Sequence, residues 1–139
     1  MAKKQLPRGL RNCNPLNIVK SDNNWLGKIK PGNDPVFEQF VSIEMGIRAA
    51  VLILKSYIKK HRVDTIAAII HRWAPDGQKQ ETAYIKFVTD RMQLPANFRI
   101  DYANRNHVTM LLHAMAWFEC GQEISYQYFY NAYALANRK

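Results

Sequence analysis

The segment HVTMLLHAMAWFECGQ places one carboxyl group, that of Glu119, at the end of a strongly apolar helix. Val108, Leu112 and Met115 lead up to it at spacings of four, three and four residues, so they share its helix face. Desolvation on such a face raises the pKa of a carboxyl group, which can then stay protonated near neutral pH and act as a general acid. The competing interpretation is structural, with Glu119 paired to an arginine at the edge of the core.

Glycoside cleavage uses a carboxylic acid to protonate the leaving oxygen and, in most enzymes, a second carboxylate. The candidates for that second group are Glu44 and Glu38. Glu44 also has a structural explanation, because a negative charge in the first turn of a helix suits the helix dipole. Glu38 either lines a groove or faces water. Glu81 has the same explanation as Glu44, and Asp76 lies in a loop, where polar residues are ordinary.

The stretch RGLRNCNPLNI, residues 8–18, is rich in amides and guanidinium groups and has no helical or strand period. Either side-chain amides tie down a turn here, or the stretch binds a ligand rich in hydroxyl and N-acetyl groups. Aromatic rings elsewhere in the chain can stack on the faces of sugars. The residues that we assign to substrate binding are Arg11, Asn12, Asn14, Asn17, Trp25, Trp73 and Tyr84.

Apolar residues at helical spacing predict the elements that position these groups. Ser42 is the expected N-cap of the first helix, Asp64 of the second and Ser125 of the last. Pro75 is expected to end the second helix, and Gly121 the fourth. The predicted helices cover residues 43–58, 65–73, 81–92, 106–119 and 126–136.

Proline, glycine and asparagine punctuate residues 1–41, which are predicted to be irregular with short extended pieces at 16–20 and 36–41. The fold class is therefore mainly α, with about five helices after an irregular N-terminal segment that has room for short β-strands. The length of 139 residues indicates a single domain over 1–139, with 1–7 as a flexible N-terminus. The tyrosine-rich face of the last helix is interpreted as core.

The net charge of +9 and the isoelectric point of about 9.7 favour polyanionic partners. Nucleic acid is one such partner, although the sequence has no recognisable recognition motif, and a cell wall with its carboxylates and phosphates is another. No apolar run is long enough to span a bilayer, and the basic start lacks the apolar stretch of a signal peptide. Cys13 and Cys120 are expected to be free thiols, and neither a metal nor a cofactor is expected.

Several blocks, taken in order, resemble a known family: RGLRNCNPLNI, WLG, VFEQFVSIEMGIRAAVLIL, TIAAIIHRWAP, TAYI and FECGQ. The series is similar to the lysozyme-like proteins of bacteriophages and prophages that are often labelled structural proteins, over roughly residues 7–126. A weaker likeness relates the run from NPLNI to GIRAA to the glucosaminidase branch of the lysozyme superfamily. The resemblance implies a lysozyme-like fold acting on peptidoglycan glycan strands, as a muramidase or a lytic transglycosylase, with Glu119 as the acid.

In the glucosaminidase branch, a Glu-Ser-Gly helix end precedes a similar asparagine-rich series, whereas the FECGQ block comes last here. We therefore expect a permuted order, in which the acid-bearing helix packs beside the N-terminal amide loop and Arg8 or Arg11 faces the cleft or Glu119. The family also has an acidic run after WAP, where this chain has Gln78–Glu81 in a loop. A single-carboxylate mechanism, as in lytic transglycosylases, tolerates the loss of that run.

Three functions remain open at this point. The first is a peptidoglycan-degrading glycosidase or lytic transglycosylase of phage or prophage origin. The second is a non-catalytic virion structural or cargo protein that binds the cell wall or assembles the particle with other virion proteins, and the third is a basic module for nucleic acid. For the first two, the lack of a signal peptide predicts a place in the virion or the host cytoplasm, with delivery to the wall by phage machinery.

Overall fold

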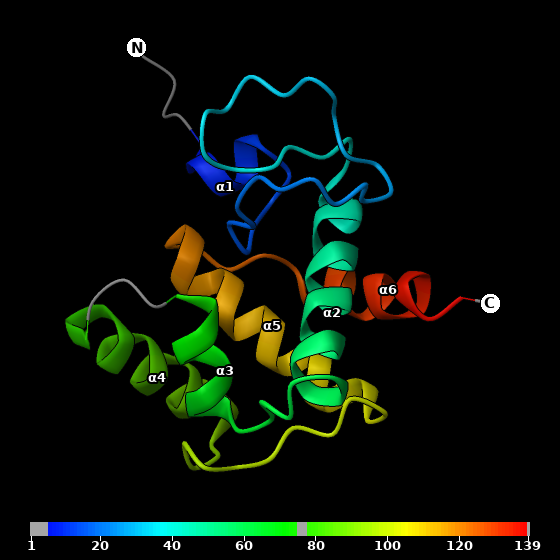
Figure 1. Cartoon of the computed structure of the whole chain (residues 1–139). Coiled ribbons are helices and arrows are strands. Elements are labelled where there is room, and N and C mark those ends of the chain that lie inside the picture. Colours follow the sequence, from blue (N-terminus) through cyan, green and yellow to red (C-terminus); the bar gives the residue numbers. More distant parts are fainter. Residues whose placement is uncertain (1–5, 75–77, 139) are drawn as a thin grey trace.

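A computed structural model describes residues 6–74 and 78–138, and these residues are mainly helical (Figure 1). Their long helices pack into a bundle, and the N-terminal segment covers one end of it. The expected mainly α fold is confirmed. The six helices of the described residues are α1 (Arg8–Arg11), α2 (Ile43–Lys59), α3 (Ile66–Trp73), α4 (Gln78–Met92), α5 (Arg105–Cys120) and α6 (Tyr126–Ala136).

Helix α2 begins where predicted, because the Ser42 side chain accepts a hydrogen bond from the backbone N–H of Met45 at 3.2 Å. Its buried stripe includes Ile47, Val51 and Leu54, and the helix packs against α6, which crosses it (Figure 1). Near the N-terminal end of α2, position 46 requires glycine, since a Cβ atom there would lie 2.0 Å from the carbonyl oxygen of Cys13. The backbone of the N-terminal segment at Cys13 therefore packs directly against the backbone of α2 at Gly46.

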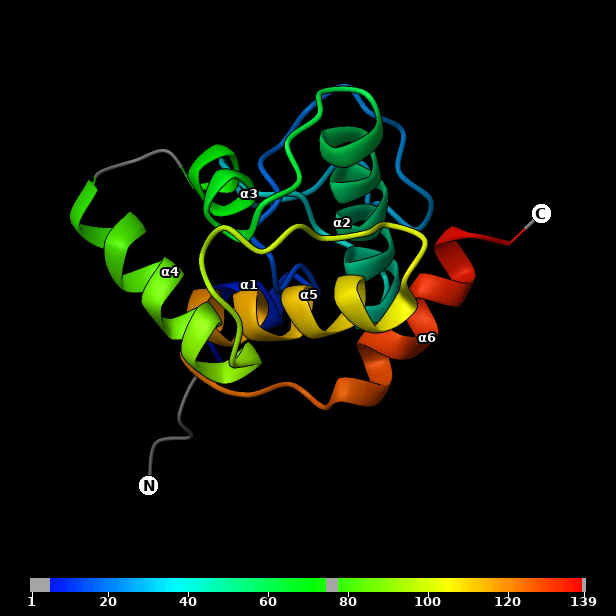
Figure 2. The same cartoon turned by 90° about the horizontal axis from the view of Figure 1, so that it is seen from below.

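Helix α5 is the central element and lies between α4 and α6 (Figure 2). It is buried nearly all round, as its sequence predicts. Asn104 caps its start by accepting a hydrogen bond from His107 N–H at 3.1 Å. Gly121 ends it in the left-handed conformation, with φ of 71°, which glycine adopts without the strain of a Cβ atom. The end of α5 also contacts α1.

Two predicted helix starts need correction. Thr65, not Asp64, caps α3, because its hydroxyl accepts a hydrogen bond from Ala68 N–H at 3.2 Å. The Asp64 carboxylate instead accepts hydrogen bonds from the Arg99 guanidinium at 3.0 and 2.7 Å. Helix α4 starts at Gln78, so Gln78–Glu81 is its first turn and not a loop. The predicted stop at Pro75 lies outside the described residues.

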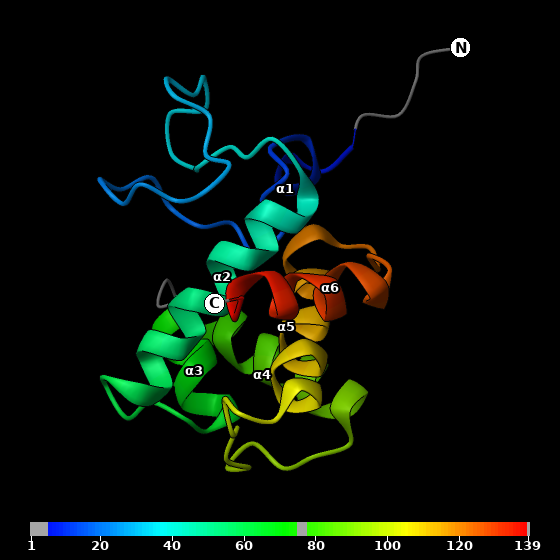
Figure 3. The same ribbon diagram turned by 90° about the vertical axis from the view of Figure 1, so that its right-hand side faces the viewer.

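The N-terminal segment is irregular as predicted, apart from the single helical turn of α1. Its extended pieces pair only as isolated antiparallel bridges, Val19 with Phe37 and Lys28 with Phe40, among the residues that the structure describes. Between α1 and α2 the segment projects away from the helices (Figure 3). The expectation of a flexible N-terminus falls largely on residues outside the description.

The interpretation of the α6 tyrosines as core is wrong for two of them. Tyr128 and Tyr130 are 42% and 38% exposed, whereas Phe129 and Ala132 carry the buried face of the helix. The ring of Tyr130 instead stacks under the Arg105 guanidinium, whose central carbon lies 3.4 Å from the ring centroid. The tyrosines that flank the buried stripe are therefore available at the surface.

Candidate active site

The carboxyl group of Glu119 lies in the last turn of α5 and is held at both oxygens. Asn17 Nδ2 donates a hydrogen bond to Oε1 at 3.0 Å. The Tyr84 hydroxyl, from α4, donates one to Oε2, also at 3.0 Å. Among the residues that the structure describes, the partners of this carboxyl group are thus an amide and a phenol from two other parts of the chain, and not the arginine of the structural interpretation.

Burial raises the pKa of Glu119 above its ordinary value of 4.5, and this is the largest influence on the group. The hydrogen bonds from Asn17 and Tyr84 act in the opposite direction, because they stabilise the ionised form. The net effect is a raised pKa. The carboxyl group therefore has the burial and the direction of pKa shift that a general acid needs, as its helical position predicts.

Asn17 reaches Glu119 from a tight turn at the N-terminus. Its backbone N–H bonds to the Asn14 carbonyl at 3.0 Å, and its φ of 54° is left-handed, a conformation that asparagine tolerates better than most residues. The thiol of Cys120 donates a hydrogen bond to the Pro15 carbonyl at 3.4 Å. These contacts confirm the prediction that the acid-bearing helix end packs beside the amide loop.

Tyr84 is 2% exposed, and its ring lies against Phe118 with 4.3 Å between centroids. Burial, with the neighbouring Glu119 carboxylate as a smaller cause, raises the pKa of Tyr84 well above 10, so the phenol remains a neutral donor. Burial likewise raises the pKa of Cys120 to about 11, which leaves a neutral thiol. Both cysteines are free, as expected.

Glu119 lines one hollow, and its hydrogen-bond partner Asn17 lines another. The first, the acid hollow, is lined by Gln80, Ala83, Phe118 and Glu119 and has a volume of about 410 Å³. The second, which we call the aromatic cavity, has a volume of about 220 Å³. Asn17 lines the aromatic cavity and bonds to Glu119, and so connects the two. The aromatic cavity is lined by Asn17, Ile18, Val19, Ser21, Asn23, Trp25, Ile53, Tyr57 and Trp73.

The remaining residues that we assigned to substrate binding divide into two groups. Trp25 and Trp73 line the aromatic cavity. Asn12 and Asn14 are buried, and Asn14 ties the turn together by bonding to Ile18 N–H and to the carbonyls of Ile18 and Glu38, each at 2.9 Å. Asn14 therefore serves to tie down the turn, which was one of the two explanations for the amide-rich stretch. Asn17 lines a cavity, so for this residue the other explanation, contact with a ligand, stays open.

The expectation that Arg8 or Arg11 faces the cleft or Glu119 is wrong for Arg8. Nε and Nη2 of its guanidinium donate hydrogen bonds to the two oxygens of the Asp34 carboxylate, each at 2.7 Å, and the ring of Phe37 lies below the guanidinium. Arg11 lines a separate polar hollow with Asp34 and Gln39. Arg8 is therefore held within the N-terminal segment by its ion pair with Asp34, and Arg11 lines the polar hollow beside that pair.

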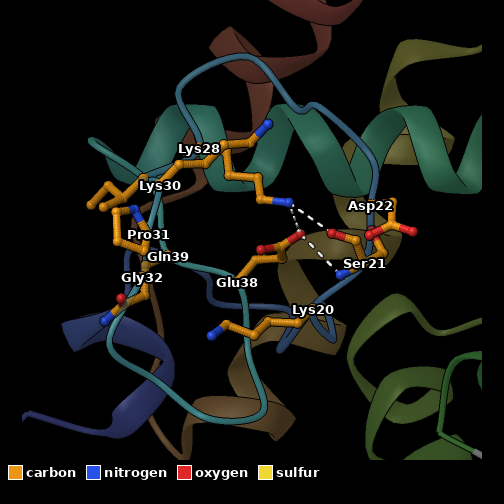
Figure 4. Close-up of a pocket in the computed structure, with 10 residues that line it drawn as sticks. Lys20, Ser21, Asp22, Lys28, Lys30, Pro31, Gly32, Glu38 and Gln39 are labelled. Atoms are coloured by element: carbon orange, nitrogen blue, oxygen red, sulfur yellow. Dashed lines mark hydrogen bonds and ion pairs between the residues drawn. The ribbon is translucent and has the colours of Figure 1, made fainter.

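The two second-carboxylate candidates have surroundings of their own. Glu38 is 2% exposed and forms an ion pair with Lys28 at 2.9 Å, and it accepts a hydrogen bond from Ser21 N–H at 3.3 Å (Figure 4). It lines a different, lysine-rich pocket. Glu44 occupies the first turn of α2, as its structural explanation predicts. Neither residue lines the acid hollow or the aromatic cavity.

The remaining acidic candidates near α4 have other surroundings. Glu81, in the first turn of α4, forms an ion pair with His71 at 2.9 Å. Asp76 lies outside the described residues.

Within the described ranges, no cluster of three or more metal-ligating side chains is present. Over the same ranges, every helix is too short or too polar to cross a bilayer.

Comparison with known proteins adds one relative. No family model matches the chain. The chain is 39% identical over 97 residues to "Protein P5" of Pseudoalteromonas phage PM2, a match that covers 68% of this chain and 61% of that protein. This chain is related to a bacteriophage protein. It spans about three fifths of the length of the curated relative that it matches.

Sequence reasoning missed Tyr57 as a residue of the site. Tyr57 lies near the end of α2, where its spacing only indicated a helix, yet it lines the aromatic cavity and contacts Trp73 with 5.6 Å between ring centroids. The only signal available was that it is the single aromatic residue of α2. The role of Tyr84 as a donor to Glu119 was also hidden, because no pattern relates α4 to the end of α5.

Proposed function

We propose that the chain is a lysozyme-like glycosidase of phage or prophage origin that cleaves the glycan strands of peptidoglycan, with Glu119 as the general acid. The observation that carries this proposal is the Glu119 carboxyl group itself. It is half-buried, has a raised pKa, is oriented by Asn17 and Tyr84, and lines an open hollow. Partial burial beside two neutral donors suits a group that must hold a proton. A carboxyl group that served stability alone would gain more from a cation beside it.

The chemistry that fits these surroundings uses one carboxyl group. Protonated Glu119 gives its proton to the glycosidic oxygen, and the bond from that oxygen to the anomeric carbon breaks. The 6-hydroxyl oxygen of the same sugar then bonds to the anomeric carbon, and its proton returns to the Glu119 carboxylate. This lytic transglycosylase route needs no second carboxylate, and among the described residues Glu119 is the only carboxylate that lines either hollow.

The relationship to a phage protein supports the setting of this activity. We propose that the protein is carried in the virion, or is made in the host cytoplasm and released to the wall by phage machinery. The net charge of +9 would then hold the protein against the carboxylates and phosphates of the wall.

The second candidate is a virion structural or cargo protein that uses the same fold without catalysis. The similarity to a bacteriophage protein favours it as much as it favours the enzyme. Such a protein would bind the cell wall or contact other virion proteins, and Glu119 would serve only to join α5 to the N-terminal turn.

The test is the clearing of a suspension of purified cell walls, stripped of outer membrane, by the wild type and by Glu119→Gln. Glu123→Gln is the matched control, because Glu123 lies four residues further on with a side chain that is 54% exposed. The enzyme predicts clearing by the wild type and the control, loss by Glu119→Gln, and similar melting temperatures. Anhydro-sugar products would identify the transglycosylase route. Binding to walls without clearing by any of the three proteins would replace the enzyme with the second candidate.

A further inference from the structure

A nearly buried carboxylate lines the lysine-rich pocket of the N-terminal segment (Figure 4). Only Oε2 of Glu38 is engaged, by the Lys28 ammonium at 2.9 Å and by Ser21 N–H at 3.3 Å. The other oxygen, Oε1, accepts no hydrogen bond from the described residues and points toward the Pro31 and Gly32 side of the pocket. An ionised carboxylate accepts at both oxygens, so Oε1 is free to accept a hydrogen bond from a ligand.

The surrounding chain holds this carboxylate in place. The backbone N–H of Glu38 donates to the Ile18 carbonyl at 3.0 Å, and its carbonyl accepts from Asn14 Nδ2 at 2.9 Å. The Lys28 ammonium has three acceptors, which are Glu38 Oε2 and the carbonyls of Ser21 and Asn23 at 2.8 and 2.9 Å. Because an ammonium has three donors, Lys28 has none left for a ligand and serves to position Glu38.

A second lysine of the pocket is differently placed. Lys20 lines it, and its side chain extends below Glu38 in the view of Figure 4, with no ion pair to any residue that the structure describes. Lys30 differs, because its ammonium donates to Asn24 Oδ1 at 2.7 Å. Asp22 is the other acid of the lining, so three lysines and two carboxylates leave the pocket one positive charge in excess.

These charges select the chemical class of the ligand. The excess positive charge repels a simple cation, and a simple anion would meet the Glu38 carboxylate. A group with an ammonium and a carboxylate on one carbon suits both sides, since its ammonium can donate to Glu38 Oε1 and its carboxylate can pair with Lys20. The pocket volume of about 300 Å³ is at the lower end for small-molecule sites, as a group of this size requires.

We propose that the lysine-rich pocket binds a zwitterionic amino-acid group, with Glu38 as the acceptor for its ammonium and Lys20 as the partner of its carboxylate. Two sources carry this group: a free amino acid, and a wall peptide in which a diamino-dicarboxylic residue keeps one amino-acid end unlinked. Ser21 lines both this pocket and the aromatic cavity, so a peptide bound here would lie beside that cavity. Only the wall peptide as the source rests on the proposed function.

Titration calorimetry with two N-acetylated tripeptides tests this proposal. Both contain alanine and γ-linked D-glutamate, and they end in meso-diaminopimelate or in lysine, which keeps the side-chain amine and lacks only the carboxylate on the same carbon. We expect the wild type to bind the diaminopimelate peptide at least about tenfold more tightly, because the lysine peptide lacks the partner of Lys20. Lys20→Gln should lose this preference. Lys30→Gln removes the same charge from the same pocket and, as the matched control, should keep it.

Glu38→Gln tests the other contact and should weaken the binding of both tripeptides, because both donate an ammonium. This variant leaves Lys28 without its carboxylate, so where it fails to fold, Lys20→Gln at an exposed position carries the test. Equal binding of the two tripeptides by the wild type, or an unchanged preference in Lys20→Gln, would overturn the proposal.

Free meso-diaminopimelate separates the two sources, since it carries the zwitterionic group without the peptide. Affinity equal to that of the tripeptide would assign a free amino acid, and tighter binding of the tripeptide would assign the wall peptide. Glu119 does not line this pocket, so Glu119→Gln should bind the tripeptides as the wild type does. A preference for diaminopimelate without any clearing of walls would leave this inference standing and remove the proposed enzyme, whereas clearing without the preference would remove only this inference.

Discussion

Asn17 Nδ2 lies 3.0 Å from Glu119 Oε1, although 102 residues separate the two along the chain. This hydrogen bond brings the N-terminal turn to the end of α5. It also opposes the effect of burial, because it stabilises the ionised carboxylate. Asn17 therefore influences both the position and the protonation of the proposed acid.

Replacing Asn17 by glycine should move the pH profile of wall cleavage. Glycine adopts the φ of 54° without strain, so the turn is retained while the amide is lost. Without this donor the pKa of Glu119 should rise further, and a general acid with a higher pKa stays active to higher pH. We expect a lower maximal rate and an alkaline limb of kcat/KM at higher pH. An unchanged limb would mean that Glu119 is not the titrating acid.

Glu119→Gln should change the dependence of stability on pH. A carboxyl group whose pKa is higher in the folded than in the unfolded protein favours folding fully below its ordinary value of 4.5 and loses that contribution as the pH rises through the folded value. The wild type should therefore lose stability relative to Glu119→Gln from about pH 4.5 upward. Urea denaturation of both proteins between pH 4 and 8 measures the difference. A constant difference across this range would contradict the raised pKa.

Asp34→Asn should remove the acid sensitivity of the N-terminal segment. The Arg8 guanidinium holds the pKa of Asp34 well below its ordinary value of 3.8, with further help from the backbone N–H groups of Phe37 and Val36 and the amide of Asn12. A depressed pKa contributes stability above 3.8 that is lost as the pH falls further. We expect a lower melting temperature for Asp34→Asn at pH 7 and a smaller drop than the wild type on acidification. Asp90→Asn, at an exposed ion pair, is the control.

Gly46→Ala should destabilise the contact between α2 and the N-terminal segment. The added Cβ would lie 2.0 Å from the Cys13 carbonyl oxygen, and backbone cannot rotate away as a side chain can. We expect a loss of about 1–3 kcal/mol in the free energy of unfolding. Alanine at an exposed helical position such as Lys55 should be nearly neutral by comparison. Equal stability of Gly46→Ala and the wild type would show that the segment moves off α2 without cost.

The helices and the burial of Glu119 could be predicted because both depend on local spacing. Ile47, Val51 and Leu54 fall on one face of α2 by period alone, and Met115 leads to Glu119 in the same way. Caps were less certain, since Asp64 and Thr65 are adjacent and both residue types can cap. The helix begins one residue later than predicted, so Thr65 is its N-cap and Asp64 pairs with Arg99 instead.

The contacts that assemble the site could not be predicted in the same way. Arg8 finds Asp34 across an irregular segment, where no period relates the two positions. Tyr84 reaches Glu119 only because α4 packs along α5, and Tyr57 lines the cavity only because residues of the N-terminal segment form its other walls. Charge could not select a partner for Arg8 or for Glu38, because several opposite charges were available to each.

The link between Asn17 and Glu119 also decides when the proposed site can be completed during synthesis of the chain. A ribosome makes Glu119 102 residues after Asn17, so the amide turn lacks this partner until the end of α5 has been made. A chain released before α5 is complete would contain every aromatic residue of the cavity but no acid beside it. Under the proposed function, nascent or truncated chains that end before α5 would therefore have no wall-cutting activity.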